Sequence, residues 1–389
     1  MPPSDASPRI LLVLPTYLPE TFGGAEQQSR KLAAALLARG ASVSILTPAV
    51  NPGTPRRERA GALTIHRFRQ RHLPNLGGRR MMSFLLWTLK SAAFIWRRRR
   101  EYDVVHIIHG RLHALGPLIG AALAGKPTLV KIGRGGPGFF DIEAVRTKAV
   151  IGWPCAFLVK RLTNGFIANS QEIADDLEAH GVPSTLVHRI PNGVVIPPSR
   201  EPAAEAANTL RFVYLGRLDA EKALDRMIAG FAQLPANPSA KLILVGEGSC
   251  GEELKALAVR LGIADRVEFP GRVNDVAPFL ETADFYISTS LSEGMSNALL
   301  EAMSHAVPPL VSRVSGVEDM LVDGVSGLLF DAGDWGAYAA KLRTAIEMAP
   351  ATRRRLGLAA AQTIRDRFSM DYVAEQHLAL YARLITSRI

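Results

Sequence analysis

Two alternating patterns dominate this sequence, and their alternation restricts the fold more than any other feature. Short apolar runs rich in Val, Ile and Leu alternate with longer segments whose apolar residues recur with the period of an α-helix. Strands of a parallel sheet are buried on both faces by the helices that connect them, so they read as continuous apolar runs. The pattern therefore predicts an α/β fold.

The alternation occurs in two series, which predicts two domains. The first predicts a helix over 25–39 and strands over 10–14, 42–47, 104–108, 128–132 and 165–169. The second predicts strands over 210–215, 241–245, 267–269, 285–288 and 309–312, with helices over 224–233, 250–261 and 298–305. A chain of 389 residues exceeds the roughly 250–300 that one core supports. We expect domains over 1–195 and 209–368, joined by the Pro-rich stretch 197–208, with ligands at the carboxyl ends of the strands.

Positive charge is concentrated in one part of the first domain. The net charge is +10, and residues 56–100 hold 13 Lys and Arg against a single acid, Glu58. The mostly apolar segment 81–96 is shorter than the about 20 residues of a membrane-spanning helix. Its basic flanks and aromatic residues predict that 79–100 lie on an anionic membrane surface. A core helix with a solvated arginine end explains the same pattern equally well.

Other features argue against several kinds of site. Cys155 and Cys250 lie far apart, so we expect neither a disulfide framework nor a zinc site, and a cytoplasmic location fits. The apolar run 10–14 is too short for a signal peptide. His106 and His109 have no acid beside them, so we expect no metal and no cofactor. The basic residues come with no recognisable nucleic-acid-binding module, so we expect no nucleic acid partner.

The sharpest candidate site follows the predicted strand 285–288. Glu293 lies in the turn after this strand, Gly294 leaves room for a ligand, and Glu301 lies in the next helix. The first N–H groups of this helix, which favour a phosphate, belong to Met295, Ser296 and Asn297. Two carboxylates at different depths suit the vicinal hydroxyls of a ribose or a hexose. The alternative is a capping acid and an acid on the helix surface.

Two glycine motifs add candidate ligand-binding backbone. Gly216 follows the predicted strand 210–215 and precedes Arg217 and Lys222, an arrangement that suits a diphosphate. Its alternative is the solvated start of a helix. In the first domain, Gly24 follows Gly23 between the first strand and the first helix, where backbone can approach a ligand closely.

Together these motifs resemble the family 4 retaining glycosyltransferases. They are Gly-Gly-Ala-Glu at 23–26, Asn-Gly at 192–193, Gly-Arg and Lys within 216–222, and two glutamates with seven residues between them at 293–301. The resemblance implies the GT-B fold of two Rossmann-like domains. It also implies that the first domain binds the acceptor, that the second binds the donor, and that a last helix over 371–389 packs back on the first domain.

The resemblance further implies a role for each site residue. Arg217 and Lys222 would bind the diphosphate, and Glu293 would bind hydroxyls of the transferred sugar, so we name these three as catalytic. The other donor-binding residues would be Glu301 on the ribose, Gly24 and Gly216 near the phosphates, Val273 near the base, and Gly294, Met295, Ser296 and Asn297. In retaining members the leaving diphosphate takes the acceptor proton, so the protein contributes positioning and charge stabilisation.

One departure from the family concerns the segment 131–141. Many relatives have a histidine near the sugar there, and this segment has none. Its role would pass to Arg134, Asp141, His109 or backbone groups, and the sequence does not choose among them.

These expectations lead to one function and two alternatives. We expect transfer of a sugar, with retention, from a nucleotide-sugar donor, UDP-sugar favoured, to a glycan or lipid-linked acceptor in envelope polysaccharide or lipopolysaccharide synthesis. The site would be cytoplasmic, with peripheral contact to the inner face of the plasma membrane. The alternatives are a catalytically weak scaffold of a polysaccharide assembly and a nucleotide-sugar epimerase.

Overall fold

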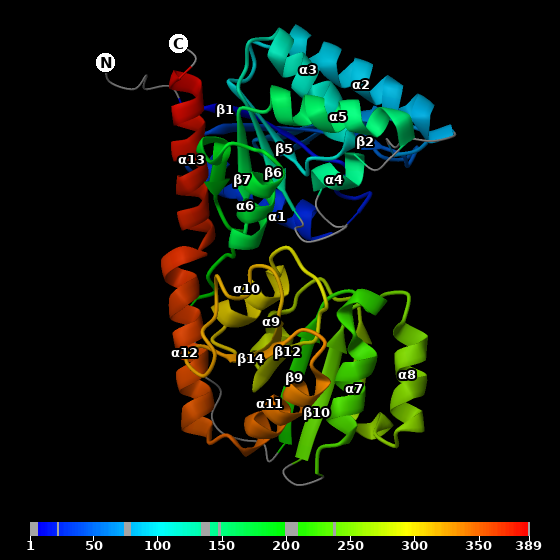
Figure 1. The fold of residues 1–389 in the computed structure, drawn as a ribbon, viewed down its shortest axis with the longest axis vertical. Coiled ribbons are helices and arrows are strands. Elements are labelled where there is room, and N and C mark those ends of the chain that lie inside the picture. The colour runs from blue at the N-terminus through cyan, green and yellow to red at the C-terminus, as the bar shows by residue number, and fades with distance from the viewer. Residues whose placement is uncertain are drawn as a thin grey trace. The chain divides into compact units, whose positions relative to one another are not determined.

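The chain folds into two compact units, each built on one sheet (Figure 1). The computed structural model describes residues 7–21, 23–73, 79–133, 141–146, 149–198, 209–235 and 239–387. Unit 1 comprises Met1–Gly193 and Met370–Ile389, and unit 2 comprises Val194–Ser369. The division thus falls just before the Pro-rich stretch 197–208, of which only the first two residues are described.

Unit 1 contains an eight-stranded sheet in the order β3-β4-β2-β1-β5-β6-β7-β8. The strands are β1 (Arg9–Val13), β2 (Ser42–Ala49), β3 (Arg57–Ala60), β4 (Leu63–Arg69), β5 (Val104–Ile108), β6 (Thr128–Ile132), β7 (Gly165–Ala168) and β8 (Val187–Arg189). The helices are α1 (Gly24–Ala38), α2 (Arg79–Arg97), α3 (Leu115–Leu123), α4 (Asp141–Arg146), α5 (Ala149–Leu162), α6 (Gln171–Ala179) and α13 (Met370–Thr386). Neighbouring strands are parallel except β3, which pairs antiparallel with β4.

Alternate residues of the central strands of unit 1, such as β1, enter two separate cores. Leu11 and Val13 face the core that contains α2, α3 and α5, whereas Ile10 and Leu12 face the core that contains α1 and α13. All four side chains are almost completely buried. This two-sided burial is the reason that the central strands appear in the sequence as continuous apolar runs.

The last helix, α13, packs on unit 1 through a buried polar cluster. Tyr381 lies 2.7 Å from Nδ1 of His106 on β5, and the rings of His106 and His377 stack at 5.5 Å. Beside them Lys131 donates to Asn192 at 2.7 Å. Burial lowers the pKa of His377 to about 3, lowers the pKa of His106 well below its usual range, and lowers the pKa of Lys131 to about 8. Both histidines are therefore neutral when α13 is docked.

Unit 2 contains a six-stranded parallel sheet in the order β11-β10-β9-β12-β13-β14. The strands are β9 (Thr209–Leu215), β10 (Ser239–Val245), β11 (Val267–Gly271), β12 (Phe285–Ser288), β13 (Pro309–Arg313) and β14 (Leu328–Asp331). The helices are α7 (Leu224–Ala232), α8 (Gly251–Arg260), α9 (Ala277–Leu280), α10 (Asn297–Ser304), α11 (Trp335–Glu347) and α12 (Pro350–Arg367). Helices α7, α8 and α11 pack against one core of this sheet, and α10 and α12 pack against the other.

The predicted strands and helices lie at the observed positions to within three residues at either end. The sequence analysis missed the hairpin of β3 and β4, the edge strands β8 and β14, and helices α3–α6, α9, α11 and α12. Strand β3 reads Arg-Glu-Arg-Ala and is mostly exposed, because the edge of a sheet tolerates charged residues that a central strand does not. Alternation of apolar runs therefore marks the centre of each sheet better than its edges.

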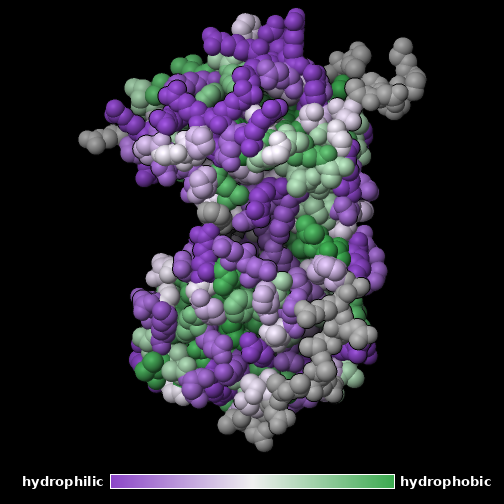
Figure 2. All heavy atoms as spheres, turned by 180° about the vertical axis from the view of Figure 1, so that it is seen from behind, coloured by the Kyte–Doolittle hydropathy of each residue, from purple (hydrophilic) through white to green (hydrophobic). Residues whose placement is uncertain are grey.

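Helix α2, which contains the segment 81–96, has both buried and exposed apolar side chains. Phe84, Trp87 and Ile95 are buried in the core, whereas Leu85 and Leu89 are exposed. On the face that Figure 2 shows, hydrophobic residues lie in small patches among hydrophilic ones. Among the described residues, no helix has both the length and the apolar character needed to span a bilayer.

We expect the stability of the protein to fall as the pH is lowered from 7 to 5. An unfolded histidine takes up a proton near pH 6.5, whereas His106 and His377 remain neutral in the folded chain, so acid favours unfolding. Each such group contributes up to about 1.4 kcal/mol per pH unit. Urea unfolding at a series of pH values measures this slope. His377→Phe should reduce it by roughly one proton, whereas exchange of the exposed His72 for Phe should leave it unchanged; equal slopes in all three proteins would refute the explanation.

Candidate active site

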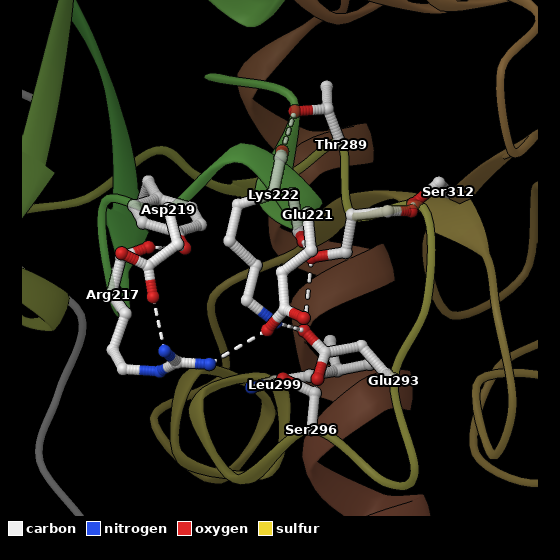
Figure 3. Close-up of polar contacts among 12 residues, drawn as sticks. Arg217, Asp219, Glu221, Lys222, Thr289, Glu293, Ser296, Leu299 and Ser312 are labelled. Carbon is white, nitrogen blue, oxygen red and sulfur yellow. Dashed lines mark hydrogen bonds and ion pairs between the residues drawn. The ribbon is translucent and has the colours of Figure 1, made fainter. Parts of the chain in front are cut away.

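A buried lysine and a glutamate meet at the carboxyl edge of the second sheet. Nζ of Lys222 lies 2.6 Å from Oε1 of Glu293 and 3.6 Å from Oε1 of Glu221 (Figure 3). The Lys222 side chain is 10% exposed and that of Glu293 is 21% exposed. The ammonium group is therefore held in place before any ligand arrives.

Backbone geometry places Lys222 at this position. It ends the short 3₁₀ helix η3 (Ala220–Lys222), and Ala223 adopts a left-handed conformation with φ of 48°. The buried Thr289, which directly follows β12, donates its hydroxyl to the carbonyls of Lys222 and Ala223 at 2.9 and 3.1 Å. The N–H of Leu291 donates to the carbonyl of Glu221 at 3.0 Å. The ends of β9 and β12 are thus tied together, which brings Lys222 to Glu293.

Arg217 belongs to the same charge network but is more exposed. It donates to Oε1 of Glu221 at 2.8 Å and also pairs with Asp219. Its side chain is 65% exposed, so it is free to turn toward a ligand. The backbone N–H of Ser249 is the main reason that the pKa of Asp219 is lowered, and it fixes this carboxylate at 3.0 Å.

Glycines let the loops of neighbouring strands touch at this edge. Gly216 has a φ of 153°, and its N–H donates to the carbonyl of Val245 at 3.0 Å. A Cβ on Gly246, which has a φ of 145°, would lie 1.8 Å from the carbonyl oxygen of Gly216. Burial raises the pKa of Tyr214 well above its usual range, so its hydroxyl stays protonated and donates to the carbonyl of Arg217 at 2.9 Å.

The turn that carries Glu293 is held by serines. Ser290 donates to Oε1 of Glu293 at 3.0 Å, and Ser312 donates to the carbonyl of Ser290 at 2.6 Å. A Cβ on Gly316 would lie 3.0 Å from the carbonyl oxygen of Gly294, so the following loop also approaches closely. The sequence analysis missed Ser290, Ser312, Gly246 and Gly316, since only their neighbours in space reveal their role.

The predicted helix after this turn is α10, and Ser296 is its N-cap. Its hydroxyl accepts from the N–H of Leu299 at 3.3 Å, so one donor of the first turn is satisfied by the cap. Met295 is buried, whereas Asn297 and Glu301 are partly exposed. Glu301 lies on α10 beyond Asn297, and its backbone carbonyl accepts from Nδ1 of His305 at 2.9 Å. Val273 follows β11 and packs against the core that contains α10.

The centre of this site carries more negative than positive charge. Two cations, Arg217 and Lys222, face three carboxylates, those of Asp219, Glu221 and Glu293. An anionic ligand of the cations must therefore displace carboxylates from them. The exposed Arg217 is the group that can exchange partners with least rearrangement.

Gly24 lies in unit 1, where it begins α1 after the N-cap residue Gly23. A Cβ on Gly23 would lie 2.5 Å from Oε2 of Glu26, and the buried Glu26 accepts from the hydroxyls of Thr16 and Thr21. The Gly-Gly-Ala-Glu motif is thus the N-cap and first turn of α1, and its glutamate binds the segment that precedes the helix.

A second polar cluster of unit 1 surrounds Asp141. Its carboxylate, which is 0% exposed, lies 3.0 Å from Nδ1 of His109 and accepts from Nε of Arg111 at 2.7 Å and from the N–H of Gly133 at 3.2 Å. Burial alone would raise the pKa of Asp141, but His109 and Arg111 overcome it and hold the pKa well below its usual range. A Cβ on Gly133 would lie 2.1 Å from the His109 ring, so only glycine leaves room for it. His109 and Asp141, two of the groups that could take the role of the missing histidine, therefore contact each other. Arg134 lies outside the described residues.

The part of the chain that the structure describes contains no group of three or more His, Cys, Asp and Glu side chains arranged to hold a metal ion. The candidate site in unit 2 is accordingly built from paired cations and carboxylates, together with backbone groups at the carboxyl edge of the sheet.

Several curated proteins are related to this chain. The lipopolysaccharide core biosynthesis glycosyltransferase LpsE of Rhizobium meliloti (strain 1021) is 30% identical over 168 residues, which are 43% of this chain and 48% of the relative. LpsD of the same organism is 29% identical over 192 residues, or 49% of this chain and 55% of the relative. The chain spans about half the length of these relatives in each match.

Solved structures share the fold across almost the whole chain. Anabaena HepE in complex with UDP has a TM-score of 0.75 and 21% identity, and the match covers 96% of this chain and 99% of that one. Sucrose-phosphate synthase from Thermosynechococcus elongatus has a TM-score of 0.77 and 21% identity, with 97% and 100% covered. The predicted GT-B fold is confirmed by this likeness.

The family comparisons divide the chain in the same way. The model of the family described as Glycosyltransferase Family 4 matches residues 22–196, and the model described as Glycosyl transferases group 1 matches residues 181–363. The two matches overlap and together extend over residues 22–363. The chain therefore belongs to the group 1 glycosyltransferases, with an N-terminal half of the family 4 type.

Proposed function

We propose that the protein transfers a sugar from a nucleotide diphosphate to a glycan or lipid-linked acceptor in the synthesis of lipopolysaccharide or another envelope polysaccharide. The observation that carries this proposal is the Lys222 ammonium, which lies 2.6 Å from Glu293 at the turn before α10. Arg217 is joined to it through Glu221, with which both cations pair. Relatives named for lipopolysaccharide core biosynthesis support the class of acceptor.

The diphosphate binds by exchanging partners with the carboxylates. Arg217 leaves Asp219 and Glu221 and takes phosphate oxygens with its two-pronged guanidinium group, whereas Lys222 contributes a fixed point charge. The first turn of α10 adds backbone donors near the same phosphates. Glu293, released in part from Lys222, accepts hydroxyls of the transferred sugar, and Glu301 accepts hydroxyls of the ribose. We expect no metal in this scheme, because the two cations neutralise the leaving group.

Transfer proceeds with retention at the anomeric carbon. The bond from this carbon to the phosphate oxygen breaks, the acceptor oxygen attacks from the same side, and its proton passes to the leaving phosphate. Charge develops on that phosphate in the transition state, so Lys222 and Arg217 stabilise the transition state more than the bound donor. UDP-sugar is the favoured donor, and the HepE structure with UDP supports this choice of base.

Helix α2 makes peripheral contact with an anionic membrane. Its exposed apolar residues include Leu85 at 46%, Leu89 at 69% and Trp96 at 48%, and four consecutive arginines, Arg97 to Arg100, follow them. Partial insertion of such residues with basic neighbours is the usual basis of interfacial binding. A lipid-linked acceptor would thus be reached from the membrane surface.

Removal of Lys222 should abolish donor recognition without unfolding the protein. We expect UDP to raise the melting temperature of the wild-type protein, since it binds the folded state only. Lys222→Ala and Glu301→Ala should each lose most of this shift, and Lys222→Ala should lower kcat by about 100-fold or more. Lys241→Ala is the matched control, because Lys241 pairs with Glu268 at 2.9 Å elsewhere on the same sheet. Full activity in Lys222→Ala would contradict the assignment, and donor binding without turnover in the wild type would favour a scaffold.

The stereochemistry of the product tests the proposed mechanism separately. With an α-linked UDP-sugar, the new glycosidic bond should also be α, which the anomeric coupling constant in a proton NMR spectrum measures. A β-linked product would show inversion and would require a protein base that this scheme does not contain. An altered sugar still attached to UDP would show epimerisation in place of transfer.

Membrane contact through α2 should depend on its exposed leucines. Leu89→Ser should reduce binding to anionic vesicles roughly tenfold, since insertion of a leucine is worth roughly 1.5–3 kcal/mol. Val259→Ser provides the control, because Val259 is 66% exposed but lies on α8 of unit 2. Vesicle flotation compares the three proteins, and an equal loss in both variants would argue against α2 as the contact.

A further inference from the structure

A pocket of about 530 Å³ opens at the outer edge of the first sheet, where β4 passes α2. The register of the hairpin ends with Arg57 opposite His66, so β4 continues three residues beyond its partner strand. The N–H of Arg67 still donates to the carbonyl of Arg56 at 2.7 Å, and beyond it the edge is left uncovered by β3. The pocket occupies this gap between the end of β4 and α2.

Five cationic side chains line the pocket. They are Arg56, Arg67, Arg69, Lys90 and Arg98. Among the described residues, only two of the five pair with an acid: Arg67 lies 2.8 Å from Glu58, and Arg98 lies 3.1 Å from Glu101. Arg69 donates only to a backbone carbonyl, that of Pro52. Glu58 and Glu101 neutralise two of the five cations, so the pocket has an excess of about three positive charges.

One of these cations is itself buried and incompletely satisfied. The Arg67 side chain is 1% exposed and donates to the carbonyls of Leu18 and Pro55. Its Nε is buried and finds no hydrogen-bond partner in the described part of the chain. A buried N–H group without an acceptor is rare in folded proteins, so an acceptor supplied by a ligand would complete it.

Aromatic side chains that pack against one another form one side of the pocket. The guanidinium of Arg98 lies 5.0 Å above the ring of Phe94, and Phe68 meets Phe94 edge-on at 5.6 Å. His66 packs against Phe94 at 5.0 Å. Burial and the charge of Arg98 lower the pKa of His66 to about 4, so near pH 7 this ring is a neutral partner. Cations fixed on this side of the pocket lose little conformational entropy when they bind an anion.

We propose that this pocket is a phosphate-binding site, distinct from the candidate donor site in unit 2, and that it takes the phosphate group of a small ester or of a lipid headgroup. Phosphate offers acceptors on several sides, as four arginines and a lysine require. The exposed apolar residues of α2 continue along the helix from Lys90 and Phe94, so a lipid chain attached to the phosphate would find apolar surface there. The site needs no nucleotide, and its test is independent of sugar transfer.

The experiment compares two double variants of the full-length protein with equal charge. Arg56→Gln/Lys90→Gln removes two of the three pocket cations that have no acidic partner in the described structure. Arg59→Gln/Arg97→Gln removes one cation from the same hairpin and one from the same helix, both outside the pocket lining. Glycerol phosphate is titrated in solution by calorimetry, and vesicles of phosphatidylcholine containing either phosphatidic acid or a fatty acid of equal charge are tested by flotation.

A pocket site predicts that only the first variant loses binding, by about tenfold or more, as expected when two charge-assisted contacts are lost. Loss of glycerol phosphate binding would identify a soluble ester as a sufficient ligand. Loss confined to vesicles with phosphatidic acid, with fatty-acid vesicles unaffected, would identify the lipid headgroup. Equal losses in both variants would reveal diffuse attraction and overturn the proposal, as would the absence of any phosphate-dependent binding by the wild type.

Discussion

The two hydrogen bonds from Thr289 to the carbonyls of Lys222 and Ala223 are the contact on which the candidate active site depends. Lys222 follows β9 and Glu293 follows β12, so the pair forms only if the two loops are held in register. Thr289 is fully buried, and its hydroxyl has no access to water as an alternative partner. The left-handed Ala223 then turns the chain into α7 and leaves the ammonium beside the carboxylate.

The sequence predicts the strands that are buried on both faces of a sheet. It does not predict the strands near the edges, which are partly exposed. The run Val104–Ile108 is entirely buried and was located to the residue, whereas β3 and β4 carry arginines and a histidine and have no uniform pattern. The same distinction applies to the candidate site. Arg217, Lys222 and Glu293 were identified from spacing, and the structure brings them together. Ser290 and Ser312 contribute only through contacts between loops, which a linear pattern does not contain.

Unit 1 buries several charged groups near its sheet, and two of them have specific polar partners. Asp141 is ionised because His109, Arg111 and the N–H of Gly133 surround it, and this cluster fixes a histidine with a φ of 69°. Lys131, two residues before Gly133, instead has Asn192 as its partner and a lowered pKa. The loops that leave β5 and β6 are thus stabilised by electrostatics, as loops that present ligand-binding groups commonly are.

In the proposed mechanism, the three carboxylates around Arg217 and Lys222 would also act at the end of each reaction cycle. A site with unopposed cations would retain a nucleoside diphosphate after the sugar has left, and departure of that product would limit turnover. Here Asp219, Glu221 and Glu293 pair with the two cations in the absence of a ligand, and these ion pairs would form again as the product leaves. In the proposed mechanism, the acids that weaken the binding of an incoming donor would also accelerate the release of the spent nucleotide, so that lower affinity would be offset by faster regeneration of the site.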